Sequence, residues 1–392
     1  MRDFKTEILR FLNDGLSSYL QITRNIKTQI MERRIELDIL RGLLICLMVV
    51  DHTPNPLREL TDQPLGFVSA AEGFVFLSAY LLGAVSQGRI QEHGLSWLRR
   101  FAFKRALNLY LIHLGMLLFL FITAGFMFQK LPGFANFILR FFETPGPALL
   151  SALLLLYQPP LFDILPMYIV FLVMTPLAFS AAQAVGWNAV MGLSGLLWVS
   201  GFIGTTGGGY PMEAMSVGSA LVIEPGAFHM RAWQFIWIAG LALGRTNHVN
   251  RRAFSPLLVV SACLTAVFFF CWRNPRIPIS PNLGDYIWML DKWQLGPLRL
   301  LNFFALVVLL RHFGPSLRQL LFWLRPLSGL GRNSLPVFSA HVCFAVLAIG
   351  FIETYQLDDW ACTAIVSLQL ALLFGYSSLL GTAKSPLGVG SS

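Results

Sequence analysis

Two side chains with complementary chemistry, Arg41 and His52, lie eleven residues apart in an apolar segment at residues 37–52. At about 100° per residue of α-helix, this separation is three turns and a remainder of about 20°. Both side chains therefore project from the same face of the helix, about 16 Å apart along its axis. Histidine accepts a proton near neutral pH, and arginine carries a permanent charge that binds anions. The pair therefore predicts base-assisted chemistry on a substrate that is anionic or becomes anionic during reaction.

Three carboxylates lie near this pair in the sequence. Asp38 precedes Arg41 by three residues, close enough on a helix to pair with the guanidinium and to lower the cost of burying it. Asp51 and Glu72 are candidates for orienting His52 or for contacting a substrate. Charged groups in apolar segments cost about 2.5 to 3.5 kcal/mol each on insertion scales, which favours functional roles. The alternatives are structural: an Asp38–Arg41 ion pair, an interfacial His52, and a Glu72 satisfied by local packing.

Composition indicates a polytopic membrane protein. The chain has 392 residues, of which 55% are hydrophobic and 12% are charged, whereas soluble proteins carry about 25% charged residues. The net charge of +9 comes from Lys and Arg between apolar segments, a pattern typical of cytoplasmic loops and of contact with anionic lipid rather than nucleic acid. The five cysteines form no CxxC pair and predict neither a disulfide framework nor a metal site.

The apolar segments predict an all-α helical bundle with about ten transmembrane helices. They are 37–52, 66–87, 104–128, 162–182, 187–204, 230–246, 255–272, 297–312, 335–353 and 360–381, and the shorter run at 147–157 is expected to be re-entrant or interfacial. Residues 1–33 predict a cytoplasmic amphipathic helix, with a partly disordered leader as the alternative. Residues 34–382 form the membrane domain and 383–392 a flexible tail. The basic loops place both termini in the cytoplasm.

A series of short motifs follows in order along the chain. The first are RIELDILRG at 34–42, DHTPNPL at 51–57 and SAAEGFVFLSAY at 69–80. The later ones are KRA at 104–106, YQP at 157–159, DILPMY at 163–168, AWQ at 232–234, DK at 291–292, LGPLRL at 295–300 and GRNSLPVF at 331–338. Together, over about residues 33–353, they resemble the OpgC-type membrane proteins of osmoregulated periplasmic glucan modification, which are relatives of the acyltransferase-3 superfamily.

This resemblance implies an O-acyltransferase of the bacterial inner membrane. The enzyme would move an acyl group, typically succinyl, from a coenzyme A thioester such as succinyl-CoA to hydroxyls of a periplasmic glucan, without a metal. His52 would be the general base that activates the alcohol, and Arg41, oriented by Asp38, would bind the anionic donor or the oxyanion. The expected partners are the lipid bilayer, the thioester and the glucan acceptor. The sequence predicts no particular oligomeric state.

Further residues are expected to bind the donor or to line the site. Arg100, Lys104 and Arg105 would hold the phosphates of coenzyme A, although for Arg100 ordinary positive-inside charge is the preferred interpretation. The residues expected to contact the acceptor or to line the site are Ser78, Tyr80, His113, Trp233, Gln234, Lys292, Arg299, Ser334 and His341. For His113 and His341 the favoured alternative is a satisfied core histidine.

Two positions depart from the family pattern. Ser78-Ala79-Tyr80 stands where the family has Ser-Gly-Tyr, which adds a methyl group at an expected close approach. Phe228-His229-Met230 replaces Phe-Asn-Pro, a change expected to affect acceptor choice or local helix geometry.

A transporter or flippase is the alternative from another functional class. Its site would lie between repeated halves near the bilayer midplane. The sequence contains no internal repeat that pairs two halves, and both Arg41 and His52 lie in the first apolar segment. These observations favour an enzyme, and retention of both residues argues against a regulator with a decayed site.

Overall fold

The computed structural model of the chain describes residues 35–127, 135–201, 215–217, 221–224, 226–246, 254–274, 277, 281, 283–314, 316 and 323–383. The predicted amphipathic segment at residues 1–33 lies outside these ranges. So does the predicted tail at 383–392, except for its first residue.

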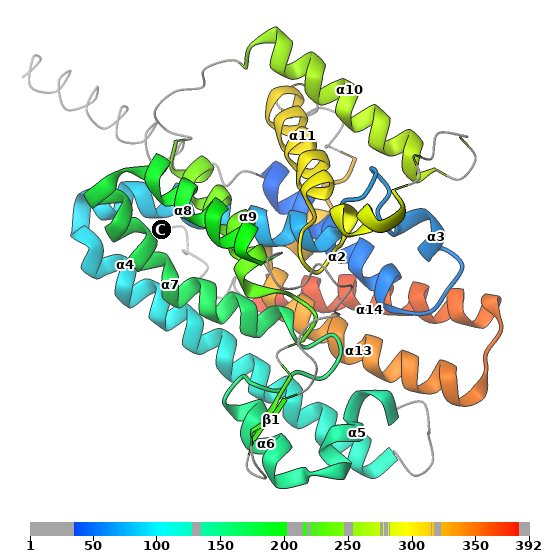
Figure 1. Cartoon of the computed structure of the whole chain (residues 1–392). Helices are drawn as coiled ribbons and strands as arrows, with labels where there is room; N and C mark the ends of the chain where they lie inside the picture. Colours follow the sequence, from blue (N-terminus) through cyan, green and yellow to red (C-terminus); the bar gives the residue numbers. More distant parts are fainter. Residues whose placement is uncertain are drawn as a thin grey trace, which may run out of the picture.

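The described chain is mostly helical, as predicted (Figure 1). The helices are α2 (Ile35–His52), α3 (Arg58–Thr61), α4 (Ala70–Met127), α5 (Ala135–Glu143), α6 (Pro145–Leu153), α7 (Ile164–Val185), α8 (Trp187–Ser200), α9 (Met230–Arg245), α10 (Pro256–Arg273), α11 (Pro297–Phe313), α12 (Leu327–Arg332), α13 (Ser334–Tyr355), α14 (Asp359–Ala383) and the 3₁₀ helix η3 (Gly284–Leu290). A short antiparallel pair, β1 (Met215–Val217) and β2 (Leu221–Ile223), is an addition that the sequence did not predict.

Two local features shape the helices around the predicted site. Helix α2 ends at His52 because Pro54 and Pro56 follow, and proline is incompatible with a helix interior. Helix α4 is interrupted at Gly94, whose φ of 70° and ψ of 178° are not helical. Glycine adopts this conformation without steric cost. The two arms of α4 leave Gly94 in different directions (Figure 1), so that both can pack against the bundle.

Five helices in the described part of the chain are long and apolar enough to cross a membrane: Ala70–Thr123, Ile164–Val185, Pro256–Arg273, Ser334–Tyr355 and Asp359–Gly381. This agrees with a membrane protein but is fewer than the ten spans predicted. Helices α8, α9 and α11 have only 14, 16 and 17 residues, and α2 contains four charged residues. Helix α6, with nine residues, is about 13.5 Å long and cannot cross a core of about 30 Å.

Glycines allow α2 and α12 to touch through their backbones. A Cβ on Gly42 would lie 2.1 Å from the carbonyl oxygen of Leu327, and one on Gly331 would lie 1.8 Å from that of Asp38. Any larger residue would force these helices apart, which is why small residues mark close helix crossings in membrane proteins. This contact fixes α2 against the segment that leads directly into α13.

The methyl group that departs from the family pattern lies at a similar contact. Ala79 is fully buried, and a Cβ on Gly240 of α9 would lie 2.7 Å from the Ala79 Cβ. The methyl group therefore packs against a glycine, which explains how α4 and α9 accommodate it.

Candidate active site

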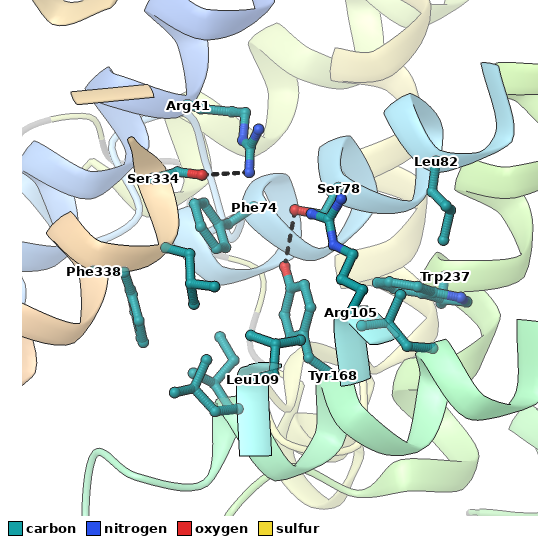
Figure 2. Close-up of a pocket in the computed structure, with 14 residues that line it drawn as sticks. Arg41, Phe74, Ser78, Leu82, Arg105, Leu109, Tyr168, Trp237, Ser334 and Phe338 are labelled. Atoms are coloured by element: carbon teal, nitrogen blue, oxygen red, sulfur yellow. Dashed lines mark hydrogen bonds between the residues drawn. The ribbon is translucent and has the colours of Figure 1, made fainter. Parts of the chain in front are cut away.

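A pocket with a charged and hydroxyl-bearing lining opens between α2, α4, α7, α9 and α13 (Figure 2). The empty space that it encloses, including open solvent at its mouth, is about 530 Å³. The polar residues that line it are Arg41, Ser78, Arg105, Tyr168 and Ser334. The remaining lining is apolar, so the polar groups stand in a largely dry environment.

The polar groups of the pocket are tied to one another across helices. Arg41 Nη2 on α2 donates a hydrogen bond to Ser334 Oγ on α13, and its guanidinium lies 5.8 Å from the centre of the Phe74 ring. Tyr168 Oη on α7 donates to Ser78 Oγ on α4 at 3.4 Å. Arg105, on the second arm of α4, brings another guanidinium to the pocket, and no carboxylate lines it. Two guanidinium groups in the lining favour binding of an anionic ligand.

His52 and His341 form a pair beyond this pocket. His52 Nδ1 lies 3.0 Å from His341 Nε2, and the two rings stack with centroids 5.1 Å apart and an angle of 18°. His341 is fully buried, whereas His52 is partly exposed. Across the residues that the structure describes, Nε2 of His52 makes no hydrogen bond. That nitrogen is therefore available to a substrate.

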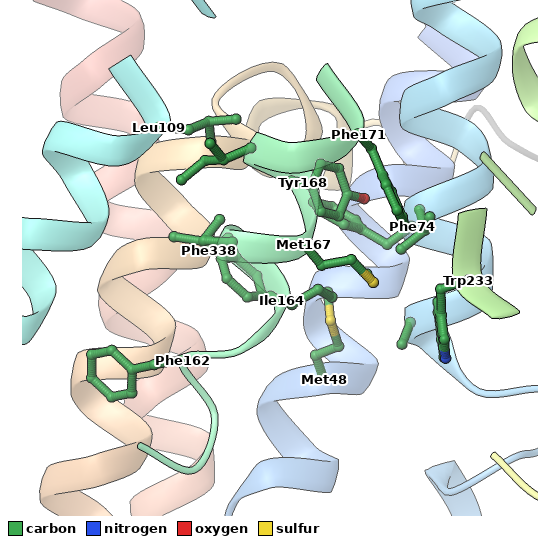
Figure 3. Packing of buried hydrophobic residues seen from close by; sticks show 14 of the residues in the cluster. Met48, Phe74, Leu109, Phe162, Ile164, Met167, Tyr168, Phe171, Trp233 and Phe338 are labelled. Carbon is green, nitrogen blue, oxygen red and sulfur yellow. The ribbon is translucent and has the colours of Figure 1, made fainter. Parts of the chain in front are cut away.

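Arg41 and His52 lie on one side of α2, as their spacing predicts, since both bond to residues of α13. His52 does not line the pocket that contains Arg41, although the two side chains share a side of α2. The candidate site therefore has two parts, a pocket with Arg41 and a histidine pair with His52. Met48 on α2 and Phe338 on α13 belong to the buried apolar cluster of these helices (Figure 3).

The two carboxylates expected to orient His52 bond elsewhere. Asp51 accepts a hydrogen bond from Thr61 Oγ1 at 2.6 Å. Glu72 accepts from the backbone N–H of Ser69 at 3.1 Å, which is one half of a capping box, and also from the Ser69 hydroxyl. It also forms a buried ion pair with Arg299 Nε. His341, rather than a carboxylate, therefore holds the imidazole of His52.

A comparison with protein families assigns the chain to one family. A family model described as OpgC protein matches residues 33–385, which is most of the 392 residues. The chain belongs to the OpgC family. Comparisons with curated proteins and with solved structures give no match. Membership confirms the resemblance carried by the motifs and suggests an acyltransferase that modifies a glucan.

A lysine lies near the histidine pair in this OpgC-family protein. Lys292 is within electrostatic reach of Asp51, His52 and Asp163, and its Nζ lies 5.0 Å from the Trp293 ring centre. The surroundings of His52 therefore include a cation and two carboxylates.

Asp163 is a half-buried carboxylate that the sequence reasoning did not select, although it begins the DILPMY motif. Its Oδ2 accepts a hydrogen bond from the Ala227 backbone N–H at 2.9 Å. Burial raises the pKa of Asp163 to about 6, although the Ala227 hydrogen bond lowers it in part. Asp163 thus joins the start of α7 to the segment before α9.

Several predicted residues have packing roles in the structure. Trp233 is fully buried, and its Nε1 donates to the Trp293 carbonyl at 2.9 Å. Gln234 exchanges hydrogen bonds of 2.7 and 2.8 Å with Ser194, joining α9 to α8. Tyr80 stacks on Phe76 with centroids 6.3 Å apart. These residues hold α9 in place behind the pocket rather than lining it.

The remaining predicted residues lie apart from the pocket. Arg100 and Lys104 are exposed and do not line it, so Arg105 alone of that basic cluster reaches it. His113 is fully buried, with its ring centre 6.4 Å from that of Phe162. Asp38 is buried where α2 meets α12. Within the described ranges, no group of three or more His, Cys, Asp and Glu residues is placed to hold a metal ion.

Proposed function

We propose that this protein is an integral membrane O-acyltransferase that moves an acyl group, succinyl in the first instance, from acyl-CoA to a hydroxyl of a periplasmic glucan. The observation that carries the proposal is the joint positioning, by α2 and α13, of an anion-binding pocket and an imidazole pair. Acyl transfer from a coenzyme A thioester needs both parts. Membership of the OpgC family supports the same reaction class.

In this proposal the guanidinium pocket binds the donor. Coenzyme A carries several phosphate charges, and Arg41 and Arg105 supply two permanent cations with planar donor groups suited to phosphate oxygens. The hydroxyls of Ser78, Tyr168 and Ser334 add neutral donors. With its phosphates there, the extended donor would direct its thioester along α13 toward His341.

His52 acts as the general base in this scheme. An alcohol is a poor nucleophile near neutral pH, so its proton must be removed as the oxygen attacks the acyl carbon. Nε2 of His52 is the available nitrogen, and the hydrogen bond at Nδ1 to His341 fixes the orientation of the ring. Lys292 and Asp51 would contact the sugar beside it. The Glu72–Arg299 pair supports this region from within.

The membrane arrangement follows from these roles. We propose that the two arms of α4 cross the membrane separately and that both termini lie in the cytoplasm of a bacterial inner membrane. The pocket with Arg41 then faces the cytoplasmic supply of acyl-CoA, and His52 faces the periplasmic glucan. Donor and acceptor would meet at the imidazole pair from opposite sides.

Transfer of a labelled acyl group from the donor to glucan tests the proposal directly. Purified protein in detergent is incubated with labelled succinyl-CoA or acetyl-CoA and glucan, and the glucan is analysed by mass spectrometry. We expect covalent acylation, and a loss of about 100- to 10,000-fold in rate for His52→Ala. Exposed His93→Gln serves as the control. Movement of donor or glucan across vesicles without acylation would replace the proposal with a transporter.

A further inference from the structure

The imidazole of His341 has one nitrogen engaged and one without a partner. Its Nε2 faces Nδ1 of His52 at 3.0 Å. Its Nδ1 is buried and has no hydrogen-bond partner among the residues placed by the structure. An unpaired buried polar atom costs about 1 to 3 kcal/mol. At a candidate active site, such an atom indicates that a substrate group supplies the missing partner.

Base catalysis by His52 fixes the tautomer of both rings. His52 can accept a proton at Nε2 only while its Nδ1 carries hydrogen, and that hydrogen is then donated to Nε2 of His341. His341 must therefore carry its own hydrogen on Nδ1. In the state that is ready to react, the unpartnered atom is an N–H group that needs an acceptor.

His341 lies one helical turn beyond the pocket lining on α13. On α13 it lies three residues after Phe338 and seven residues, about 10 Å, after Ser334. Both of those residues line the pocket, and the Phe338 and His341 ring centres are 6.1 Å apart. Because the two nitrogens of an imidazole point away from each other, Nδ1 is directed away from His52. A donor bound by Arg41 and Arg105 would approach from the pocket side.

We propose that His341 is the general acid that protonates the leaving thiolate, which rests on the acyl transfer proposed above. The acceptor hydroxyl gives its proton to His52 Nε2 as its oxygen bonds to the acyl carbon. The Nδ1 proton of His52 passes to His341 Nε2, and the Nδ1 proton of His341 passes to sulfur as the C–S bond breaks. The products are an ester and a thiol, and both imidazoles end neutral.

The relay reverses the hydrogen bond between the rings, so it must be reset. After the reaction His52 carries hydrogen on Nε2 and His341 donates from Nε2. His341 Nδ1 takes up a proton from the vacated pocket, the proton on His341 Nε2 returns to His52 Nδ1, and partly exposed His52 releases the proton on its Nε2, which restores the first tautomers.

Donors whose leaving thiols differ in pKa distinguish a general-acid role of His341 from a positioning role. The alkyl thiol of coenzyme A leaves poorly without a proton, whereas an aryl thiol such as 4-nitrothiophenol leaves readily as its anion, because the lower its pKa the faster a thiol leaves. His341→Gln retains an amide oxygen that accepts the hydrogen bond from His52 but cannot pass on a proton. We expect kcat/KM to fall about 100-fold with succinyl-CoA, and by less than about 10-fold with the 4-nitrophenyl thioester of succinate.

Two further variants serve as controls for the comparison of the two donors. His52→Ala should lose activity equally with both donors, because it removes the base, and His93→Gln should match the wild type. Equal losses of His341→Gln with both donors would assign His341 to positioning and overturn the relay. Absence of glucan acylation by the wild-type protein with either donor would instead refute the proposed function.

A second measurement needs only the wild-type protein and succinyl-CoA. In mixtures of H₂O and D₂O, a relay that moves several protons in one step gives a curved dependence of rate on deuterium fraction. We expect this curvature, and a straight line would overturn the relay. This result decides the matter if His341→Gln does not fold or if the aryl thioester is not a substrate.

Discussion

The buried ion pair between Glu72 and Arg299 should be among the most stability-critical contacts of the protein. Both side chains are almost completely buried, at 0% and 2% exposure. Removing one partner of such a pair leaves an uncompensated charge in a dry interior and costs about 3 to 5 kcal/mol. We therefore expect Glu72→Gln to lower the free energy of unfolding by about that amount, a factor of roughly 100 to 5,000 in the folding equilibrium.

Unfolding by SDS titration in mixed micelles measures this loss. The double variant Glu72→Leu/Arg299→Met replaces both charges by apolar groups of similar size and should recover most of it, since paired removal is often neutral. The exposed pair Arg89–Glu92, 3.4 Å apart at 54% and 60% exposure, is the matched control, and Glu92→Gln should cost less than about 1 kcal/mol. If Glu72→Gln unfolded within about 1 kcal/mol of the wild type, or if the losses of the single variants simply added in the double variant, the reasoning from burial would be wrong.

Three further predictions follow from other contacts. The pKa of Asp163 is raised to about 6, so the folded state binds the carboxyl proton more tightly than the unfolded state does. The free energy of unfolding should therefore fall by about 3 kcal/mol as the pH rises from about 4 through 6. Thermal melts of Asp163→Asn should show a flatter dependence of stability on pH. Gly331→Ala should destabilise by at least about 1 to 3 kcal/mol through its clash with the Asp38 carbonyl, whereas Gly88→Ala, which meets nothing within 4 Å, should change stability by less than about 1 kcal/mol. Arg105→Gln should weaken coenzyme A binding about 10- to 100-fold in calorimetry, and exposed Arg99→Gln should not; an unchanged affinity for Arg105→Gln would move the donor site elsewhere.

The sequence was sufficient for the helical class, for the family and for the shared face of Arg41 and His52, because these depend on composition, ordered motifs and helical period. The sequence did not predict which residues Arg41 and His52 bond to. Ser334 and His341 lie 293 and 289 residues away along the chain. No local rule connects such distances, although the motif at 331–338 did mark Ser334 as a site residue.

Other differences have local reasons. Residues 104 and 105 point about 100° apart on a helix, so only one can face a given pocket, and the sequence does not show which. Helical spacing from Arg41 also gave no sign that His52 would lie outside the pocket that contains Arg41. For Glu72, the Ser-x-x-Glu pattern at 69–72 is a capping-box signal that could have indicated its structural role.

The long separation between the two histidines has a consequence for biosynthesis. His52 leaves the ribosome 289 residues before His341, and at about 5 to 20 residues per second this interval is about 15 to 60 s. Throughout it, the first helix carries polar side chains whose partners have not been translated. We therefore expect the nascent chain to keep α2 in a temporary environment, beside water or an insertion factor, until α13 is translated and supplies Ser334 and His341.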